Sequence, residues 1–97
     1  MDKAAKLLIL KQDLQLLTTA NDSLLENLLD LAAGAITREG ITLIENDIEC
    51  DMAVIQYAAY LFRKRAAEDA AMPRFLRWQL NNLLFSQKAG GVMESDF

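Results

Sequence analysis

The segment from Pro73 to Phe85 most constrains the fold of this chain, because as a helix it would be apolar on two opposite sides. At 100° per residue, three leucines fall within about 60° of one another, whereas Trp78 and Phe85 lie about 180° to 200° from the first leucine. These leucines are Leu76, Leu80 and Leu83. A small domain covers only one such side with its own core, so the second side is expected to meet another molecule.

Two helices are predicted in the first forty residues. Leucines spaced three and four apart indicate a helix over residues 2–17. A second helix is expected over residues 23–39, because Ser23 and Glu26 have the spacing of a capping box. Gly40 then occupies the position at which a helix commonly ends.

A third helix is predicted over residues 47–69, capped by Asn46 or Asp47, and it is expected to be the longest element. Before it, Ile41 to Ile44 is too short to indicate a sheet and is interpreted as an extended connector. The buried side of the third helix is predicted from a stripe at spacings of four and three. This stripe is formed by Ile48, Met52, Ile55, Ala59, Phe62 and Ala66.

Pro73 marks the first turn of a fourth helix, which is expected to extend to about Lys88 and to end before Gly90-Gly91. The sequence therefore predicts an all-α protein, a small four-helix bundle with a long third helix. Residues 1–89 are expected to form one domain and residues 90–97 a flexible C-terminal tail. A chain of this length buries only about 60–65% of its unfolded surface, so the core is modest.

The charge distribution argues against a protein that grips nucleic acid. Net charge is −4, with four basic and ten acidic residues over 1–51 but six basic and four acidic over 52–97. A DNA-binding domain usually presents a strongly basic surface, and a recognition helix would not expose Trp78 and Phe85. An acidic surface is instead compatible with a channel through which DNA slides without adhering.

The residue types also argue against catalysis. The chain has no histidine and one cysteine, Cys50, so the usual zinc ligand sets and an internal disulfide are excluded. No nucleophile has a base at a recognisable spacing, and no phosphate-binding loop occurs. We therefore expect neither an enzyme nor a cofactor. The single cysteine, the lack of a membrane-length apolar run and the lack of a signal pattern favour the cytosol and no membrane partner.

Four carboxylates at the start of the third helix raise the alternative of a cation site. Their position favours a helix-dipole role, because acidic groups in a first turn offset the positive helix end. The calcium-loop spacing is absent, and no metal is expected. The four are Glu45, Asp47, Glu49 and Asp51.

The basic cluster contains Arg63, Lys64, Arg65, Arg74 and Arg77. Aromatic residues near it in sequence would permit stacking with bases, but Glu68 and Asp69 interrupt the positive charge. A solvated face or salt bridges are the favoured interpretation. Arg74 and Arg77 are then candidates for an electrostatic docking surface.

Two stretches of the sequence carry a resemblance to a known family. They are Asp51-Met52-Ala53-Val54-Ile55-Gln56-Tyr57-Ala58-Ala59-Tyr60-Leu61 and, after a short joint, Pro73-Arg74-Phe75-Leu76. In these stretches the chain resembles the head–tail connector (adaptor) proteins of tailed bacteriophages, also described as DNA-packaging proteins. The resemblance covers roughly residues 20–86. It rests on hydrophobic patterns and one proline, and the connector Ile41 to Asn46 is short for that family.

The resemblance implies a structural subunit of the virion, made in the bacterial cytoplasm and possible in a prophage. Such subunits form a homo-oligomeric ring beneath the portal protein, continue the DNA channel and dock a tail-completion or stopper protein. DNA is then only non-specific cargo. Ring contacts join two different faces of neighbouring subunits, and aromatic residues commonly dominate such contacts. The candidate interface residues are Tyr57, Tyr60, Arg74, Arg77, Trp78, Phe85 and Phe97.

Core packing is the alternative role for each of these aromatic residues. The alternative function is a small dimeric helical regulatory or adaptor protein that pairs through the fourth helix and binds one protein partner. In the tail, Val92, Met93 and Phe97 would contact a partner, with plain disorder as the other possibility.

Overall fold

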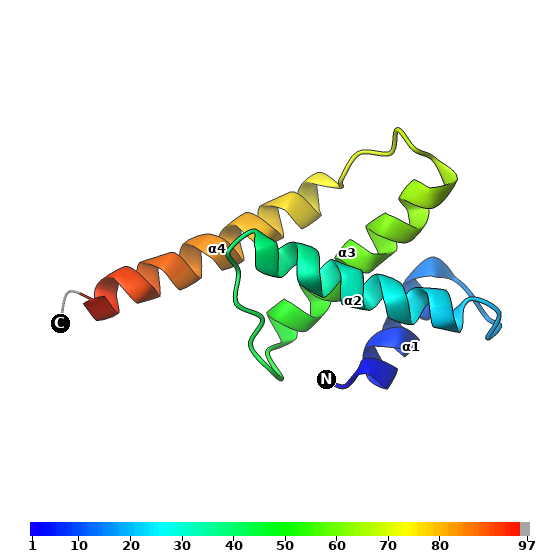
Figure 1. Cartoon of the computed structure of the whole chain (residues 1–97), viewed down its shortest axis with the longest axis horizontal. Coiled ribbons are helices and arrows are strands. Elements are labelled where there is room, and N and C mark those ends of the chain that lie inside the picture. Colours follow the sequence, from blue (N-terminus) through cyan, green and yellow to red (C-terminus); the bar gives the residue numbers. More distant parts are fainter. Residues whose placement is uncertain (96–97) are drawn as a thin grey trace.

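The computed structural model describes residues 1–95, with side chains described to Ala89, and contains four helices (Figure 1). They are α1 (Lys3–Leu14), α2 (Asp22–Arg38), α3 (Ile48–Ala66) and α4 (Arg74–Ser95). No strand occurs in this described part. The prediction of a small all-α bundle is confirmed.

The core lies where α2 and α3 cross, with α1 packed against both and α4 packed mainly against α3. Leu10 of α1 and Leu80 of α4 are both fully buried there. The loop before α3 contributes Ile41, which is 1% exposed. The other buried apolar residues are Leu25, Leu28, Leu29, Ala32, Ile36, Cys50, Ala53, Val54, Ile55, Ala58, Ala59, Leu76 and Leu83.

The first helix is shorter than the sequence pattern indicated. Gln15 adopts a left-handed backbone with φ 59°, and the Leu16 amide donates to the Lys11 carbonyl at 2.9 Å. This turn ends α1 at Leu14 and leaves Leu17 97% exposed. The apolar spacing continued past the helix end, so the predicted end near residue 17 was wrong.

The two ends of α2 and the start of α3 differ in how they are capped. Asn21 precedes α2 without a side-chain cap, and Ser23 lies inside the helix, so the predicted capping box was wrong. Gly40, with φ 98°, follows the end of α2 as predicted. Asp47 caps α3 by accepting a hydrogen bond from the Glu49 amide at 3.3 Å, as one of the two predicted caps.

The buried side of α3 was correctly predicted only at its centre. Ile55 and Ala59 are each 1% exposed, whereas Ile48 is 60% exposed and Ala66 is also exposed. All four lie on one side of the helix by spacing. The two ends are exposed because this 19-residue helix extends beyond the elements that cover its middle.

The fourth helix continues past Lys88 and through Gly90-Gly91 to Ser95, so its predicted end was wrong and α4, at 22 residues, is the longest helix. Glycine costs about 1 kcal/mol in a helix interior, which weakens a helix without forbidding it. Phe97 lies outside the described residues, and the flexibility of the tail stays a prediction. In Figure 1 the C-terminal part of α4 extends away from the other helices, in a molecule measuring 52 × 30 × 18 Å.

Candidate protein interface

Helix α4 has a buried face and an exposed aromatic face, as its sequence spacing predicted. Leu76, Leu80 and Leu83 are 2%, 0% and 6% exposed and complete the core. On the other side, Phe75, Trp78 and Phe85 are 61%, 60% and 71% exposed, and we call these three residues the aromatic face. Water therefore contacts most of the surface of three large aromatic rings. This exposure is unusual, because aromatic side chains are normally buried in a core or an interface.

Phe75 belongs to this face although it was not among the predicted interface residues. Its ring centroid lies 5.9 Å from that of Trp78, with the planes tilted by 34°. Its place on this face was predictable from the sequence spacing, because residues three and seven apart share a side of a helix. Phe75, Trp78 and Phe85 follow one another at those two spacings.

Two polar contacts hold α4 against the end of α2 and the following loop. The Arg77 guanidinium pairs with the Glu39 carboxylate through both terminal nitrogens, one of them at 3.3 Å. This hydrogen bond raises the pKa of Arg77 above its ordinary value, and burial opposes the shift. Farther along, the Gln87 amide donates to the Thr42 carbonyl at 2.7 Å, and the Thr42 amide donates back at 2.8 Å.

These contacts give the two candidate arginines different surroundings. Arg77 is held in the ion pair with Glu39 and therefore helps to orient α4. Arg74 is exposed and forms no ion pair with the residues that the structure describes. Of the two, Arg74 is the one whose charge is available to a partner.

The two candidate tyrosines lie on α3 and pack against the core. Both are half-buried, and their rings meet edge to face with centroids 5.9 Å apart. Lys64 donates to the Tyr60 hydroxyl at 3.3 Å and lies 5.6 Å from the centre of that ring. Core packing therefore accounts for much of their surface, as the alternative role supposed.

A second apolar surface, which was not predicted from the sequence, lies between the first half of α2 and the last turns of α3. Its floor is formed by Leu24, Leu28, Leu31 and Leu61, and its rim by Lys64, Arg65 and Glu68. We call this surface the leucine groove. Leu31 is 57% exposed, so the groove is open to a partner. No single-helix pattern shows it, because two helices contribute to it.

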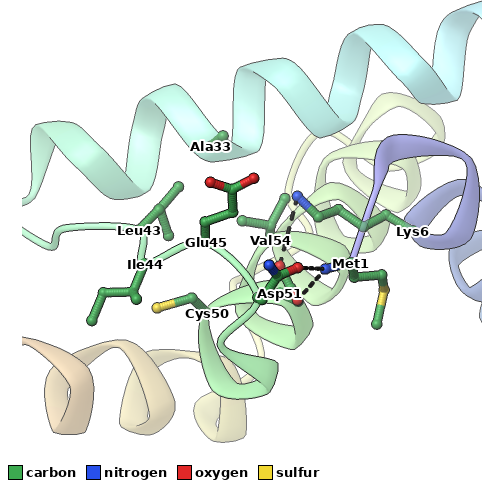
Figure 2. A pocket seen from close by; sticks show the side chains of 10 residues that line it. Met1, Lys6, Ala33, Leu43, Ile44, Glu45, Cys50, Asp51 and Val54 are labelled. Carbon is green, nitrogen blue, oxygen red and sulfur yellow. Dashed lines mark hydrogen bonds and ion pairs between the residues drawn. The ribbon is translucent and has the colours of Figure 1, made fainter.

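The carboxylate of Asp51 lies in a different environment, a small cavity beside the α2–α3 loop (Figure 2). The N-terminal ammonium of Met1 is 3.3 Å from one of its oxygens, and Lys6 Nζ is 3.7 Å from the other. Met1 also donates to the Asn46 side chain at 2.8 Å. These pairs join α1, α3 and the loop. Among the side chains that the structure describes, those of residues 1–89, no three acidic or cysteine side chains are grouped as metal ligands.

Replacing Asp51 with asparagine should lower the free energy of unfolding by about 1–3 kcal/mol, because two partly buried cations lose their common partner. Urea unfolding of the full chain measures this. Asp30→Asn is the matched control, since Asp30 pairs with Lys3 at 2.8 Å but is 67% exposed. Its effect should stay below about 0.5 kcal/mol. Equal effects of the two variants would show that burial does not matter for this pair.

Cys50 is a packed residue of the core. It is 1% exposed, and its thiol donates to the Asp47 carboxylate at 3.2 Å. Burial raises the pKa of the Cys50 thiol above its ordinary value of 9.0, and the neighbouring carboxylate adds to the shift. The nucleophilic thiolate is therefore scarce at neutral pH.

Cys50 should react with iodoacetamide at neutral pH only after denaturation. Because the folded protein holds the thiol proton more tightly than the unfolded chain, this group contributes stability below pH 9.0 that is lost as pH rises further. Cys50→Ala should remove this part of the alkaline loss of stability. Denaturant unfolding between about pH 7 and about pH 10, a range that brackets the ordinary pKa of a thiol, would measure the change. Rapid alkylation of the native protein would contradict the packed assignment.

Comparison with protein-family models, with curated proteins and with solved structures found no match. Within the described residues, none of the helices combines the length and the apolar character needed to cross a bilayer.

Proposed function

We propose that this protein is a structural connector subunit of a tailed bacteriophage, which associates into a ring beneath the portal, continues the DNA channel and docks a tail-completion or stopper protein. The observation that carries the proposal is the exposed aromatic face of α4 on a helix whose opposite face closes the core. A domain that exposes three large rings in one row has a surface suited to protein association.

The second support is that the chain has two apolar surfaces of different composition. The aromatic face lies on α4, whereas the leucine groove lies between α2 and α3. A ring needs two unlike surfaces on every subunit, because each contact joins one surface to the other. A symmetric pair through α4 alone would use only one of them.

The charges of α4 also disfavour its antiparallel pairing with a second α4. Arg74 and Lys88, both exposed, flank the aromatic face at its two ends. Antiparallel pairing centred on the aromatic face would bring Arg74 of one copy near Lys88 of the other, and like charges at short range are destabilising. This favours a contact between different surfaces over the alternative of a two-fold dimer.

The phage assignment follows from the sequence resemblance, and the net charge of −4 suits a channel lining that must not retain DNA. The test is assembly on isolated portals. Purified portal rings from the phage or prophage that encodes this chain should bind it in a symmetric ring, seen by electron cryomicroscopy. Failure to bind those portals at about 1 mM protein, where binding as weak as about 4 kcal/mol would still be detected, would overturn the proposal.

A further inference from the structure

We propose that the leucine groove receives the acidic, apolar C-terminal segment 92–97 of a second copy of this chain. This proposal rests on the proposed self-assembly and names the two surfaces that meet. The segment is Val92-Met93-Glu94-Ser95-Asp96-Phe97, which contains three large apolar residues and two acids. The segment is complementary to the groove, because its apolar side chains would cover the leucine floor and its negative charges would lie beside the basic groups of the rim.

The groove is complementary to this segment in polarity. Its floor consists of four leucine side chains from two helices. Leu31, on the outer side of α2, is 57% exposed, so an apolar side chain placed there would remove substantial leucine surface from water.

The groove is also complementary in charge. Lys64 and Arg65 are exposed on its rim and form no ion pair with any residue that the structure describes, although Lys64 contacts Tyr60. Glu68 is the single acid among the rim residues. Two basic groups beside an apolar floor favour an occupant with acidic side chains, and Glu94 and Asp96 are such side chains.

The position of the groove requires the segment to come from another molecule. The helices that form the groove, through the first half of α2 and the last turns of α3, lie toward the opposite end of the longest axis from the C-terminal end of α4 (Figure 1), and that axis measures 52 Å. Six residues span at most about 20 Å when fully extended, so segment 92–97 does not reach the groove of its own chain. The C-terminal part of α4 leads away from the other helices (Figure 1), which leaves the end of α4 accessible to a second copy.

A contact between opposite ends of two copies is heterologous, so the same contact repeats from each copy to the next. The chain of subunits closes into a ring when the rotation between neighbouring subunits permits it. The same helix would bring the aromatic face toward the neighbour. Val92 follows Phe85 by the seven-residue spacing that separates Phe85 from Trp78. The segment therefore continues the apolar pattern of α4 in the sequence.

A charge-reversal experiment on the full chain tests the pairing. The groove variant carries Lys64→Glu and Arg65→Glu, and the tail variant carries Glu94→Lys and Asp96→Lys. Each alone should associate at least tenfold more weakly than the unmodified chain at low ionic strength, measured by sedimentation velocity. An equimolar mixture should recover association, because every groove then meets a tail of opposite charge in the other variant. One chain with all four substitutions should also recover it.

A second pair of variants avoids the charges. Leu31→Asp, in the groove, should weaken association at least tenfold, whereas Leu8→Asp, on α1 at 59% exposure, should leave it unchanged. Circular dichroism melting controls for folding. Leu31 and Leu8 have nearly equal exposure, so a general effect of adding surface charge would be the same in both variants.

Self-association of the unmodified chain that is unaffected by the groove and tail variants would overturn this inference and leave the connector proposal standing. Loss in both variants without recovery on mixing would also overturn it, because the two surfaces would then not be partners. A monomer up to about 1 mM would overturn it as well. Recovery on mixing, without any binding to portals, would support this contact and reject the connector function.

Discussion

Replacing Trp78 with alanine should weaken self-association by about thirtyfold while leaving the isolated subunit folded. The indole is 60% exposed and lies at the centre of the aromatic face, next to Phe75. Truncating a central aromatic residue of an interface commonly costs about 2 kcal/mol or more in binding. Within the subunit it loses only an exposed ring contact, which is worth about 0.5–1.5 kcal/mol.

Sedimentation equilibrium gives the dissociation constant, and thermal unfolding of dilute protein gives the stability of the subunit. Leu8→Ala is the matched control, because Leu8 is 59% exposed on a different helix. It should change neither quantity appreciably. Unfolding of the isolated Trp78→Ala subunit, with association retained by the folded fraction, would show that Trp78 serves the core and that the aromatic face is not an interface.

Leu80→Ala should produce the opposite pattern, with a loss of about 2–5 kcal/mol in the free energy of unfolding. Leu80 is fully buried on the inner face of α4, between Leu76 and Leu83. The deletion leaves a cavity in the layer that joins α4 to α3, and the lost contacts are not replaced by water. For a domain of this size, each kcal/mol lowers the melting temperature by about 4–8 °C.

The melting temperature of Leu80→Ala should therefore fall by about 10 °C or more. Phe85→Ala is the control on the opposite face of α4, where the side chain is 71% exposed, and its melting temperature should change by a few degrees at most. Comparable losses in the two variants would mean that α4 does not have one core face and one free face.

Helix spacing predicted the class of the fold and the two faces of α4, because both follow from periodicity within a single segment. Leu80 is buried and Trp78 is exposed, as that periodicity indicated. The ends of helices were harder to predict, since they depend on single backbone conformations. Gln15, with φ 59°, ends α1 where the leucine spacing would have continued it.

Contacts between distant segments were not predictable from local patterns. Arg77 and Glu39 are 38 residues apart in the sequence, and Gln87 and Thr42 are 45 apart. Ile48 shares a side of α3 with Ile55 but is exposed, because no neighbouring element covers that end of the helix. Burial depends on how far the neighbours extend, which the pattern of one helix does not contain.

The leucine groove was missed for the same physical reason. Leu31 and Leu61 come from different helices, and each belongs to a stripe that extends into the core. Their common surface exists only because α2 and α3 cross. Phe75, in contrast, was predictable, because it precedes Trp78 by three residues on the same side of α4.

Native mass spectrometry of the unmodified protein over a concentration series measures whether the chain associates with itself through unlike surfaces. We expect a closed ring of more than two subunits, with its population increasing with concentration and decreasing in Trp78→Ala. A monomer up to about 1 mM, or a dimer that remains unchanged on dilution, would contradict this expectation.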